Sequence, residues 1–363
     1  MDRRLIWSIK SSYITPTRKK LDELAAREDL YDCSKLDVKN RKYRKAVKSF
    51  EIAAKKGYSV VTYVDDCYPA RLRGLSLPPP VLYVRGNVGA LNGIVYAGIV
   101  GCRKCDSYGR RVATEIACEI AHTGAGIISG GAEGVDAAAH AGALRANAPT
   151  IAVMGCGLDV IYPACNKELF DKIEKSGGAI ISEFPFGEPP RKRNFPHRNR
   201  IIAAMSSAVV VARAGKRSGS LITANQAINM NRTVFAVPGN IGEYLSAGVN
   251  ALIRDGAMPL LCAMDVIDEL ILKEPDFFVR EKENIKIEKT VPVIEREQAP
   301  KKREKGLSEY EAEIVSIIKD GFNTQPLLEE KVSFDASRLT ALLGIMEIKQ
   351  IIKKGADKKY VIK

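Results

Sequence analysis

From about residue 58 the chain alternates between short apolar runs and longer stretches with helical periodicity. Most of the apolar runs are nearly continuous, and helical segments separate most of them. Short apolar strands joined by helices predict a mostly parallel sheet that is covered by helices on both faces, in an α/β fold of the doubly wound kind. We expect strands at residues 94–101, 125–129, 150–155, 178–182, 208–213, 233–238 and 258–262.

The segments on either side of this alternation have different patterns. Residues 1–57 are rich in Lys and Arg and predict a small helical region, whereas the core is expected to span residues 58–272. Residues 273–305 are charged and poor in apolar side chains, which is typical of a linker. Residues 306–363 contain three short amphipathic helices and a final strand, and this pattern favours a winged-helix-like module.

Charge narrows the range of partners. Of the 363 residues, 56 are Lys or Arg and 43 are Asp or Glu, so the formal net charge is +13. This surplus favours a polyanionic partner, either nucleic acid or an anionic membrane surface, over a protein that is merely soluble and basic. The N-terminus shows no signal-peptide pattern, and no apolar run reaches the roughly 18 residues of a spanning helix. We therefore expect a cytoplasmic protein without membrane contact.

The segments that follow the predicted strands are where a ligand should bind. In an open parallel sheet, ligands bind outside the carboxyl ends of the strands. Each segment there is rich in glycine, basic, or both, so backbone N–H groups and cations converge on one crest of the sheet. For any single loop, a tight turn is the alternative explanation; together the loops predict an anion site. The loops are residues 101–104, 129–136, 155–167, 183–200, 214–220 and 239–240.

Familiar nucleotide motifs are missing from these loops. Gly215 and Lys216 are followed by Arg217 where a P-loop has Ser or Thr. No GxGxxG follows the first strand of the predicted parallel sheet, and the next one ends in Ser129 and Gly130 without the acidic residue of a dinucleotide site. We therefore predict no bound cofactor.

Catalytic constellations are also sparse. His122 and His140 lie in alanine-rich helical segments, where packing is more typical than reactivity. Ser218 has no His and Asp partners at a recognisable spacing. Glu183 and Asp136 both follow strands and could form a general acid–base pair, although helix capping or pairing with nearby arginines explains them equally well. The sequence thus predicts no enzyme.

The cysteines do not predict a metal site. Cys102 and Cys105 form a single CxxC, and no second pair stands at zinc-ribbon spacing. The remaining cysteines are scattered through apolar or helical segments, as expected of free thiols in a reducing compartment.

The stretch NFPHRNRII, residues 194–202, contributes two further cations. Its Phe-Pro pair predicts a turn that places Arg198 and Arg200 on the crest, where they would face a bound anion. In the alternative, one of these arginines pairs with Glu183 or Asp136 and holds the crest together.

Six blocks of the chain, in order, resemble the motif series of the DNA processing protein A family, also called DprA or Smf. The resemblance covers about residues 58–272. It implies an extended Rossmann-like core that binds single-stranded DNA, acts in natural transformation and recombination, protects incoming strands, helps load the RecA recombinase and forms a homodimer. The blocks are GCR (101–103), SGGAEGVDAAAHAGAL (129–144), GCGLDVIYPACNKELF (155–170), SEFPFGEPPRKRNFPHRNRIIAAMS (182–206), RSGSLITA (217–224) and VFAVPGN (234–240).

The resemblance also implies roles for individual residues. Arg103 and Lys167 would be the main phosphate contacts, and Phe170 would contact a base, which suits stacking as a sequence-tolerant way to hold single strands. Backbone N–H groups of the loop that starts at residue 129 would bind a phosphate. The remaining predicted DNA contacts are three residues of this loop and three cations of the crest. They are Ser129, Gly130 and Gly131, and Lys104, Arg198 and Arg200.

Our leading hypothesis is a non-enzymatic single-strand DNA-binding protein. One alternative is a nucleotide-processing enzyme similar to the nucleoside phosphoribohydrolase-like proteins, but the nearest match to their PGGxGTxxE motif, residues 215–224, lacks both the PGG and the Glu. Another alternative is a nucleotide-sensing module whose winged helix binds duplex DNA.

Overall fold

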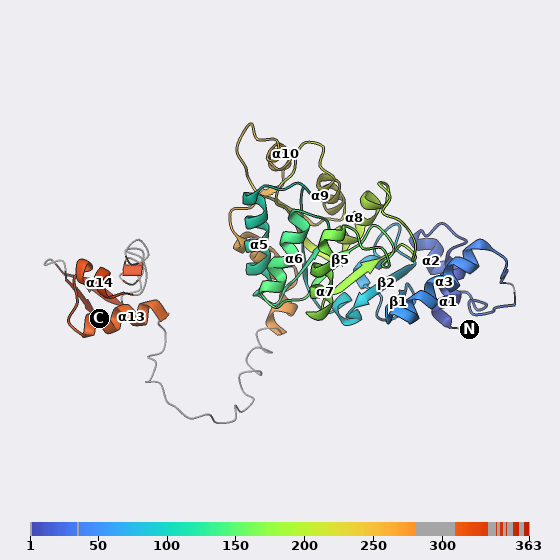
Figure 1. Ribbon diagram of the computed structural model, residues 1–363, viewed down its shortest axis with the longest axis horizontal. Coiled ribbons are helices and arrows are strands. Elements are labelled where there is room, and N and C mark those ends of the chain that lie inside the picture. Colours follow the sequence, from blue (N-terminus) through green and yellow to red (C-terminus); the bar gives the residue numbers. More distant parts are fainter. Residues whose placement is uncertain are drawn as a thin grey trace, which may run out of the picture. The chain divides into compact units, whose positions relative to one another are not determined.

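A nine-stranded sheet, counted over the residues described, forms the centre of the first of two compact units in the computed structural model (Figure 1). The units comprise residues 1–291 and 292–363. The structure describes residues 2–34, 36–280, 309–332, 339, 342–343, 346, 351–355 and 359–362.

The strands lie in the order β1-β2-β6-β5-β4-β3-β7-β8-β9. From β6 to β9 every neighbouring pair is parallel, whereas β1 pairs antiparallel with β2 and β2 pairs antiparallel with β6. All seven strands expected in the core are present, and the predicted α/β fold is confirmed. The strands are β1 Ser59–Thr62, β2 Val81–Gly86, β3 Tyr96–Val100, β4 Gly126–Ser129, β5 Thr150–Val153, β6 Ala179–Ser182, β7 Ser206–Val211, β8 Thr233–Ala236 and β9 Met258–Pro259.

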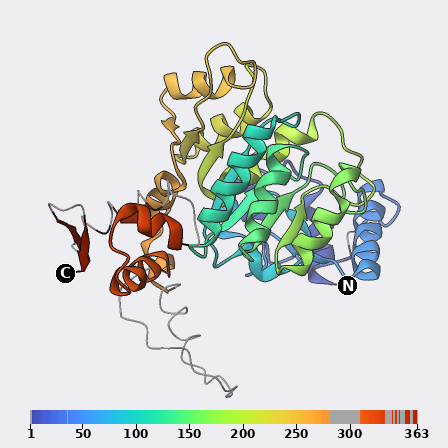
Figure 2. The same cartoon turned by 60° about the vertical axis from the view of Figure 1, so that its left-hand side comes forward.

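Helices cover both faces of the sheet. Helices α5, α6 and α11 pack together against one face, and α8 and α9 pack against the other; Figure 2 shows α5 and α6 side by side. The apolar runs are continuous because successive side chains of a strand point to opposite faces of the sheet, and both faces are buried. In β7, Val210 faces the α5 and α11 side, while Val209 faces α8. The helices of the core are α4 Ala70–Arg73, α5 Ser107–Ala121, α6 Val135–Arg145, α7 Lys167–Lys175, α8 Asn194–Met205, α9 Ser220–Asn229, α10 Ala247–Arg254 and α11 Ala263–Lys273.

The N-terminal region is helical, as predicted, and packs on the β1 edge of the sheet. It consists of α1 Arg3–Ser11, α2 Arg18–Ala25 and α3 Arg41–Lys56. Trp7 is fully buried, its indole N–H donates to the Pro80 carbonyl at 2.8 Å, and its ring stacks on Tyr63 with centroids 6.1 Å apart. The region therefore shares the core of the first unit.

The prediction of a turn at Phe195 and Pro196, within residues 194–202, is wrong. Helix α8 begins at Asn194 and runs through both residues. Proline is tolerated there because the first-turn N–H groups of a helix have no intrahelical acceptor. The apolar residues that follow are the buried face of the same helix, and Ile201 and Ile202 lie in the core.

The apolar core of the first unit includes side chains that follow residue 272. Residues 275–280 are helical, and the Phe277 and Phe278 rings are buried and in edge-to-face contact, 5.0 Å apart. The rest of the predicted linker, residues 281–305, lies outside the described residues.

The second unit has its own apolar core. Helices α13 Glu309–Lys319 and α14 Gln325–Lys331 contribute to it, as do the antiparallel strands β10 Ile352–Lys354 and β11 Tyr360–Ile362. Most of the predicted third helix lies outside the described residues, so the winged-helix assignment stays a prediction. None of the described helices has the length and apolar composition needed to cross a bilayer.

Candidate nucleic-acid interface

The order of the strands creates a crevice beside β3. From β3 the chain proceeds through β4, β5 and β6 on one side, then returns to β7 on the other side and continues to β8 and β9. The connections after β3 and β7 therefore leave the sheet in opposite directions. Such a switch point, at the carboxyl ends of the strands, is where open α/β sheets bind ligands.

A cleft of about 720 Å³ opens there, lined by segments that follow β3, β4, β5, β6, β7 and β8. Five cations and one carboxylate, Asp136, are among the described residues that line it. Within the described residues, no group of three or more His, Cys, Asp or Glu side chains is arranged to hold a metal ion. The cleft thus has a positive surplus suited to an anionic ligand. The cations are Arg103, Lys104, Lys192, Arg198 and Arg217.

Arg103 is exposed and is held on an aromatic wall. Its guanidinium carbon lies 4.6 Å from the centroid of the Phe195 ring, and Nη1 lies 3.5 Å from the Tyr162 hydroxyl. The two rings contact each other, with centroids 5.6 Å apart. Arg103 has no carboxylate within ion-pair distance among the described residues, so its charge is available to a ligand. Sequence reasoning missed both aromatic partners.

The loop after β4 brings backbone groups to the same cleft. Ser129 is buried, donates from Oγ to the Ile99 carbonyl at 2.6 Å and does not line the cleft, so its contact with DNA stays a prediction. Gly131 has φ +66° and Gly134 has φ +79°, values that L side chains rarely adopt. A Cβ at Gly134 would lie 2.3 Å from the Arg103 carbonyl oxygen, so this glycine lets the two loops pack together.

Arg198 lies beneath this loop. It is 3% exposed, and Nη1 donates to the carbonyl of Gly130. Asp136 is also buried and accepts from the Ala132 N–H at 3.3 Å. Burial lowers the pKa of Arg198 to about 10, opposed by the Asp136 charge, and burial raises the pKa of Asp136. Arg198 therefore stays charged at neutral pH and adds positive potential to the loop.

Arg200 has a different environment. Its Nη1 and Nη2 donate to both carboxylate oxygens of Glu183, at 3.1 and 2.6 Å, and His197 Nε2 lies 3.3 Å from the same carboxylate. The alternative in which one arginine pairs with Glu183 is confirmed. Arg200 does not line the cleft but a neighbouring cavity of about 530 Å³, so its contact with DNA stays a prediction.

Two predicted contacts come from α7. Lys167 is exposed at its first residue, whereas Phe170 is only 3% exposed. The Phe170 ring packs under Gly131, because a Cβ there would lie 3.0 Å from it. Asn166 ties the start of α7 to the same loop by donating to the Gly131 and Ala132 carbonyls at 3.0 and 3.1 Å. In this conformation Phe170 supports the loop, and base stacking on it stays a prediction.

Arg213, at the end of β7, holds the loops of the cleft together. It is buried and donates to Asp106, to Glu243 at 3.0 Å and to Ser246 Oγ at 2.7 Å. Asp106 in turn caps α5 by accepting from the Gly109 N–H at 2.8 Å. Sequence reasoning missed this residue because its partners are more than 25 positions away.

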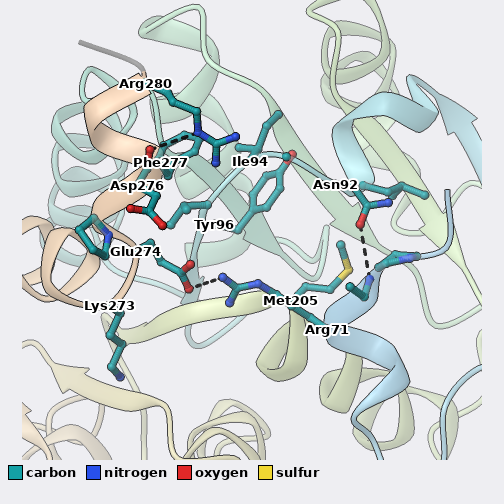
Figure 3. Close-up of a pocket in the computed structure, with 16 residues that line it drawn as sticks. Arg71, Asn92, Ile94, Tyr96, Met205, Lys273, Glu274, Asp276, Phe277 and Arg280 are labelled. Carbon is teal, nitrogen blue, oxygen red and sulfur yellow. Dashed lines mark hydrogen bonds and ion pairs between the residues drawn. The ribbon is translucent and has the colours of Figure 1, made fainter. Parts of the chain in front are cut away.

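A second cavity lies at the opposite end of β3 (Figure 3). It has a volume of about 340 Å³, and the start of β3 at Tyr96 lines it. Arg71 forms an ion pair there with Glu274, which also accepts from Ser207 Oγ at 3.2 Å. Asp276 is a second carboxylate that lines this cavity. Acids and bases are mixed in this cavity, so the cleft after β3 is the better anion site.

A family model described as DNA recombination-mediator protein A matches residues 59–271, more than half of the chain. The chain belongs to this family. The match begins at β1 and ends within α11, and it includes every loop that lines the cleft.

Curated relatives of this family have clear sequence identity to the chain. The DNA processing protein DprA of Streptococcus pneumoniae is 42% identical over 206 residues, which cover 57% of this chain and 72% of that protein. The DprA of Bacillus subtilis is 38% identical over 214 residues, 59% of this chain and 72% of that protein. Protein Smf of Synechocystis is 42% identical over 212 residues, 57% of this chain but only 52% of that protein. The chain thus matches about half the length of this last relative.

Solved structures of two family members resemble the structure of this chain. The X-ray structure of DprA from S. pneumoniae has a TM-score of 0.60 and 34% identity, covering 74% of this chain and 98% of that one. The structure of DprA from Helicobacter pylori has a TM-score of 0.54 and 32% identity, covering 60% of this chain and 96% of that one. The latter is described as giving insight into that protein's mode of binding single-stranded DNA.

Proposed function

We propose that this protein binds single-stranded DNA in the cleft beside β3. The observation that carries the proposal is the cluster of five cations around one carboxylate at the switch point of the sheet. The binding mode described for the H. pylori relative supports the same ligand class. Recognition would be tolerant of sequence, since phosphates and stacked bases are common to every strand.

Arg103, Lys104 and Lys167 would contact phosphates, together with N–H groups of the loop at residues 129–134. Arg103 and Lys167 are exposed, and the aromatic wall fixes Arg103 before DNA arrives, which reduces the entropy lost on binding. Tyr162 is half-buried and lines the cleft, so it would offer a ring to a base in addition to the Phe170 expected from sequence, whereas the Phe195 ring holds Arg103.

Binding would serve a mediator role. The protein would protect incoming strands and pass them to a RecA-type recombinase, in keeping with the description of its family. We propose that it does so without catalysis. The one carboxylate lining the cleft accepts from the backbone at Ala132, and Glu183 is held by Arg200 and does not line the cleft. Release of free base from a nucleoside monophosphate by the purified protein would contradict this part of the proposal.

The proposed DNA site is tested by the double variant Arg103→Ala/Lys167→Ala in gel-shift titrations with an oligo-dT strand; Arg103 lines the cleft, and Lys167 lies outside its lining, at the start of α7. Each lost charged contact costs about 1.5 kcal/mol, so affinity should fall about 100-fold. The slope of log affinity against log salt should also become shallower by about 1.4, because two phosphate contacts are lost.

Arg145→Ala/Lys175→Ala is the matched control. These exposed cations lie in the last turns of α6 and α7, away from the strand ends that line the cleft. The control removes the same charge and should bind as the unaltered protein does. Equal affinity of the Arg103/Lys167 variant and the unaltered protein would show that the cleft is not the DNA site.

A further inference from the structure

Helix α3 of the N-terminal region carries a stripe of exposed cations. Arg41, Arg44, Lys45, Lys48 and Lys55 are all exposed, and their spacing along the chain places them on one side of the helix. One exposed carboxylate, Glu51, lies among them, three residues after Lys48 and four before Lys55. The opposite side holds Ala46, Ser49 and Ala53, which are buried. We refer to these five cations as the α3 stripe.

The stripe carries an energetic cost. Like charges three or four residues apart on a helix repel by about 0.2–0.5 kcal/mol per pair, and cations in the first turn oppose the helix dipole. The first turn of α3 contains no acidic residue. Within the described part of the chain, Lys45 is the one member of the stripe with an ion-pair partner. An anion from outside the chain would offset this repulsion.

The loop between β6 and α8 connects the stripe with the DNA cleft. Glu188 lies 3.6 Å from Lys45 Nζ and 3.1 Å from Arg191 Nε, so this loop touches α3. Lys192, two residues before the start of α8, lines the cleft. Arg191, Lys192 and Arg193 are exposed. Cations therefore lie at the cleft, at residues 191–193 and on α3, and Glu188 bridges Arg191 of the loop and Lys45 of α3.

We propose that the α3 stripe is an accessory binding surface for the backbone of single-stranded DNA that leaves the cleft. The inference rests on the proposed function of the cleft and extends it to the N-terminal helices. With 16 residues α3 is about 24 Å long, enough to follow several phosphates. The surface contributes charge rather than stacking, so it binds strands of any sequence.

An anionic membrane is the other polyanion that a basic helix can bind. Membrane-bound amphipathic helices insert an apolar face opposite their cations. In α3 that face is small and already packed inside the fold, since Ala46, Ser49 and Ala53 are buried. The connection with the cleft therefore favours DNA.

The triple variant Arg44→Gln/Lys48→Gln/Lys55→Gln tests the stripe, because glutamine preserves helix propensity while removing charge. Affinity should be measured for a short dT strand of about 6 nucleotides, which fits the cleft alone, and a long one of about 30. We expect unchanged binding of the short strand and at least about tenfold weaker binding of the long strand. For the long strand, the salt slope should become shallower by about 2, the value for three phosphate contacts.

The matched control is Arg145→Gln/Lys172→Gln/Lys175→Gln, which removes three exposed cations from the last turns of α6 and α7. Its affinity for the short and the long DNA strand should equal that of the unaltered protein. Circular dichroism checks that the variants are folded.

The possible outcomes separate the stripe from the cleft. Unchanged binding of the long strand by the α3 variant would overturn the inference while leaving the cleft intact. Binding to phosphatidylserine vesicles that is lost in the α3 variant, with DNA binding unaltered, would overturn it in favour of a membrane. Loss of short-strand binding in the Arg103/Lys167 variant tests the cleft separately.

Discussion

Arg103 owes its position to an aromatic residue that is distant in sequence. Phe195 lies under its guanidinium and also packs on Gly155, where a Cβ would be 2.9 Å from the ring. The glycine of the loop after β5 is therefore needed for close approach of this ring. The sequence identifies the arginine by its motif, but the contact with Phe195 arises only when α8 crosses the strand ends.

Phe195→Leu should weaken binding of single-stranded DNA. Leucine fills much of the same space but removes the cation–π contact, worth about 0.5–2 kcal/mol, so affinity should fall about 2- to 30-fold. Gel-shift titration measures the change. Phe184→Leu is the control, because the Phe184 ring contacts His197 and lies outside the lining of the cleft. Equal losses in both variants would contradict a specific role for Phe195.

Helix α6 is attached to the sheet by a buried polar contact. His140 Nδ1 lies 2.7 Å from Thr150 Oγ1, which itself donates to the Ile127 carbonyl at 2.7 Å. Nδ1 is therefore the donor in this contact and carries a proton. Burial, with a smaller contribution from the Arg198 charge, lowers the pKa of His140 to about 3. The expectation that this histidine is packed and unreactive agrees with its burial.

The burial of His140 makes the stability of the fold depend on pH. Between the folded pKa of about 3 and the ordinary value of 6.5, the unfolded chain binds one more proton at His140 than the folded chain. The free energy of unfolding should therefore decrease as pH falls through this window, by up to about 1.4 kcal/mol per pH unit. Urea unfolding from about pH 7 to about pH 4 measures the slope. His140→Gln removes the titrating group and should have a shallower slope; identical slopes would contradict the assignment.

At the scale of the whole molecule, one edge of the sheet is exposed and apolar. Strand β9 is the last strand of the sheet. Leu261, just before α11, is 80% exposed, and Leu272, in the last turn of α11, is 77% exposed. Met258 and Met264 are also exposed. An open edge beside exposed apolar side chains is typical of an association surface. We propose that the homodimer expected from the family resemblance forms here.

Leu261→Asp/Leu272→Asp should therefore convert a dimer into a monomer, because two charges would be buried in each half of the interface. Sedimentation velocity measures the oligomeric state. Val38→Asp/Ile241→Asp, at exposed apolar positions outside this edge, is the matched control and should remain dimeric. A monomeric unaltered protein, or a dimeric Leu261/Leu272 variant, would contradict this assignment of the interface.

The sequence by itself determined the class of fold, the positions of the core strands along the chain and the crest on which the binding loops meet. Apolar runs of strand length, separated by helical periods, allow few other arrangements, since both faces of each strand must be buried. The family resemblance of the motifs at 101–103 and 129–144 also predicts DNA contacts at Arg103 and the glycine loop, and these contacts stay a prediction.

Only the tertiary structure decided how the remaining side chains are used. Arg198 and Arg200 are two residues apart on α8, yet one holds the loop after β4 and the other pairs with Glu183. Phe170 is buried under Gly131, and Phe195 provides the aromatic surface at Arg103. These roles depend on which partners come within a few ångströms when helices cross the ends of a twisted sheet. Partners so distant along the chain leave no periodic signal in the sequence.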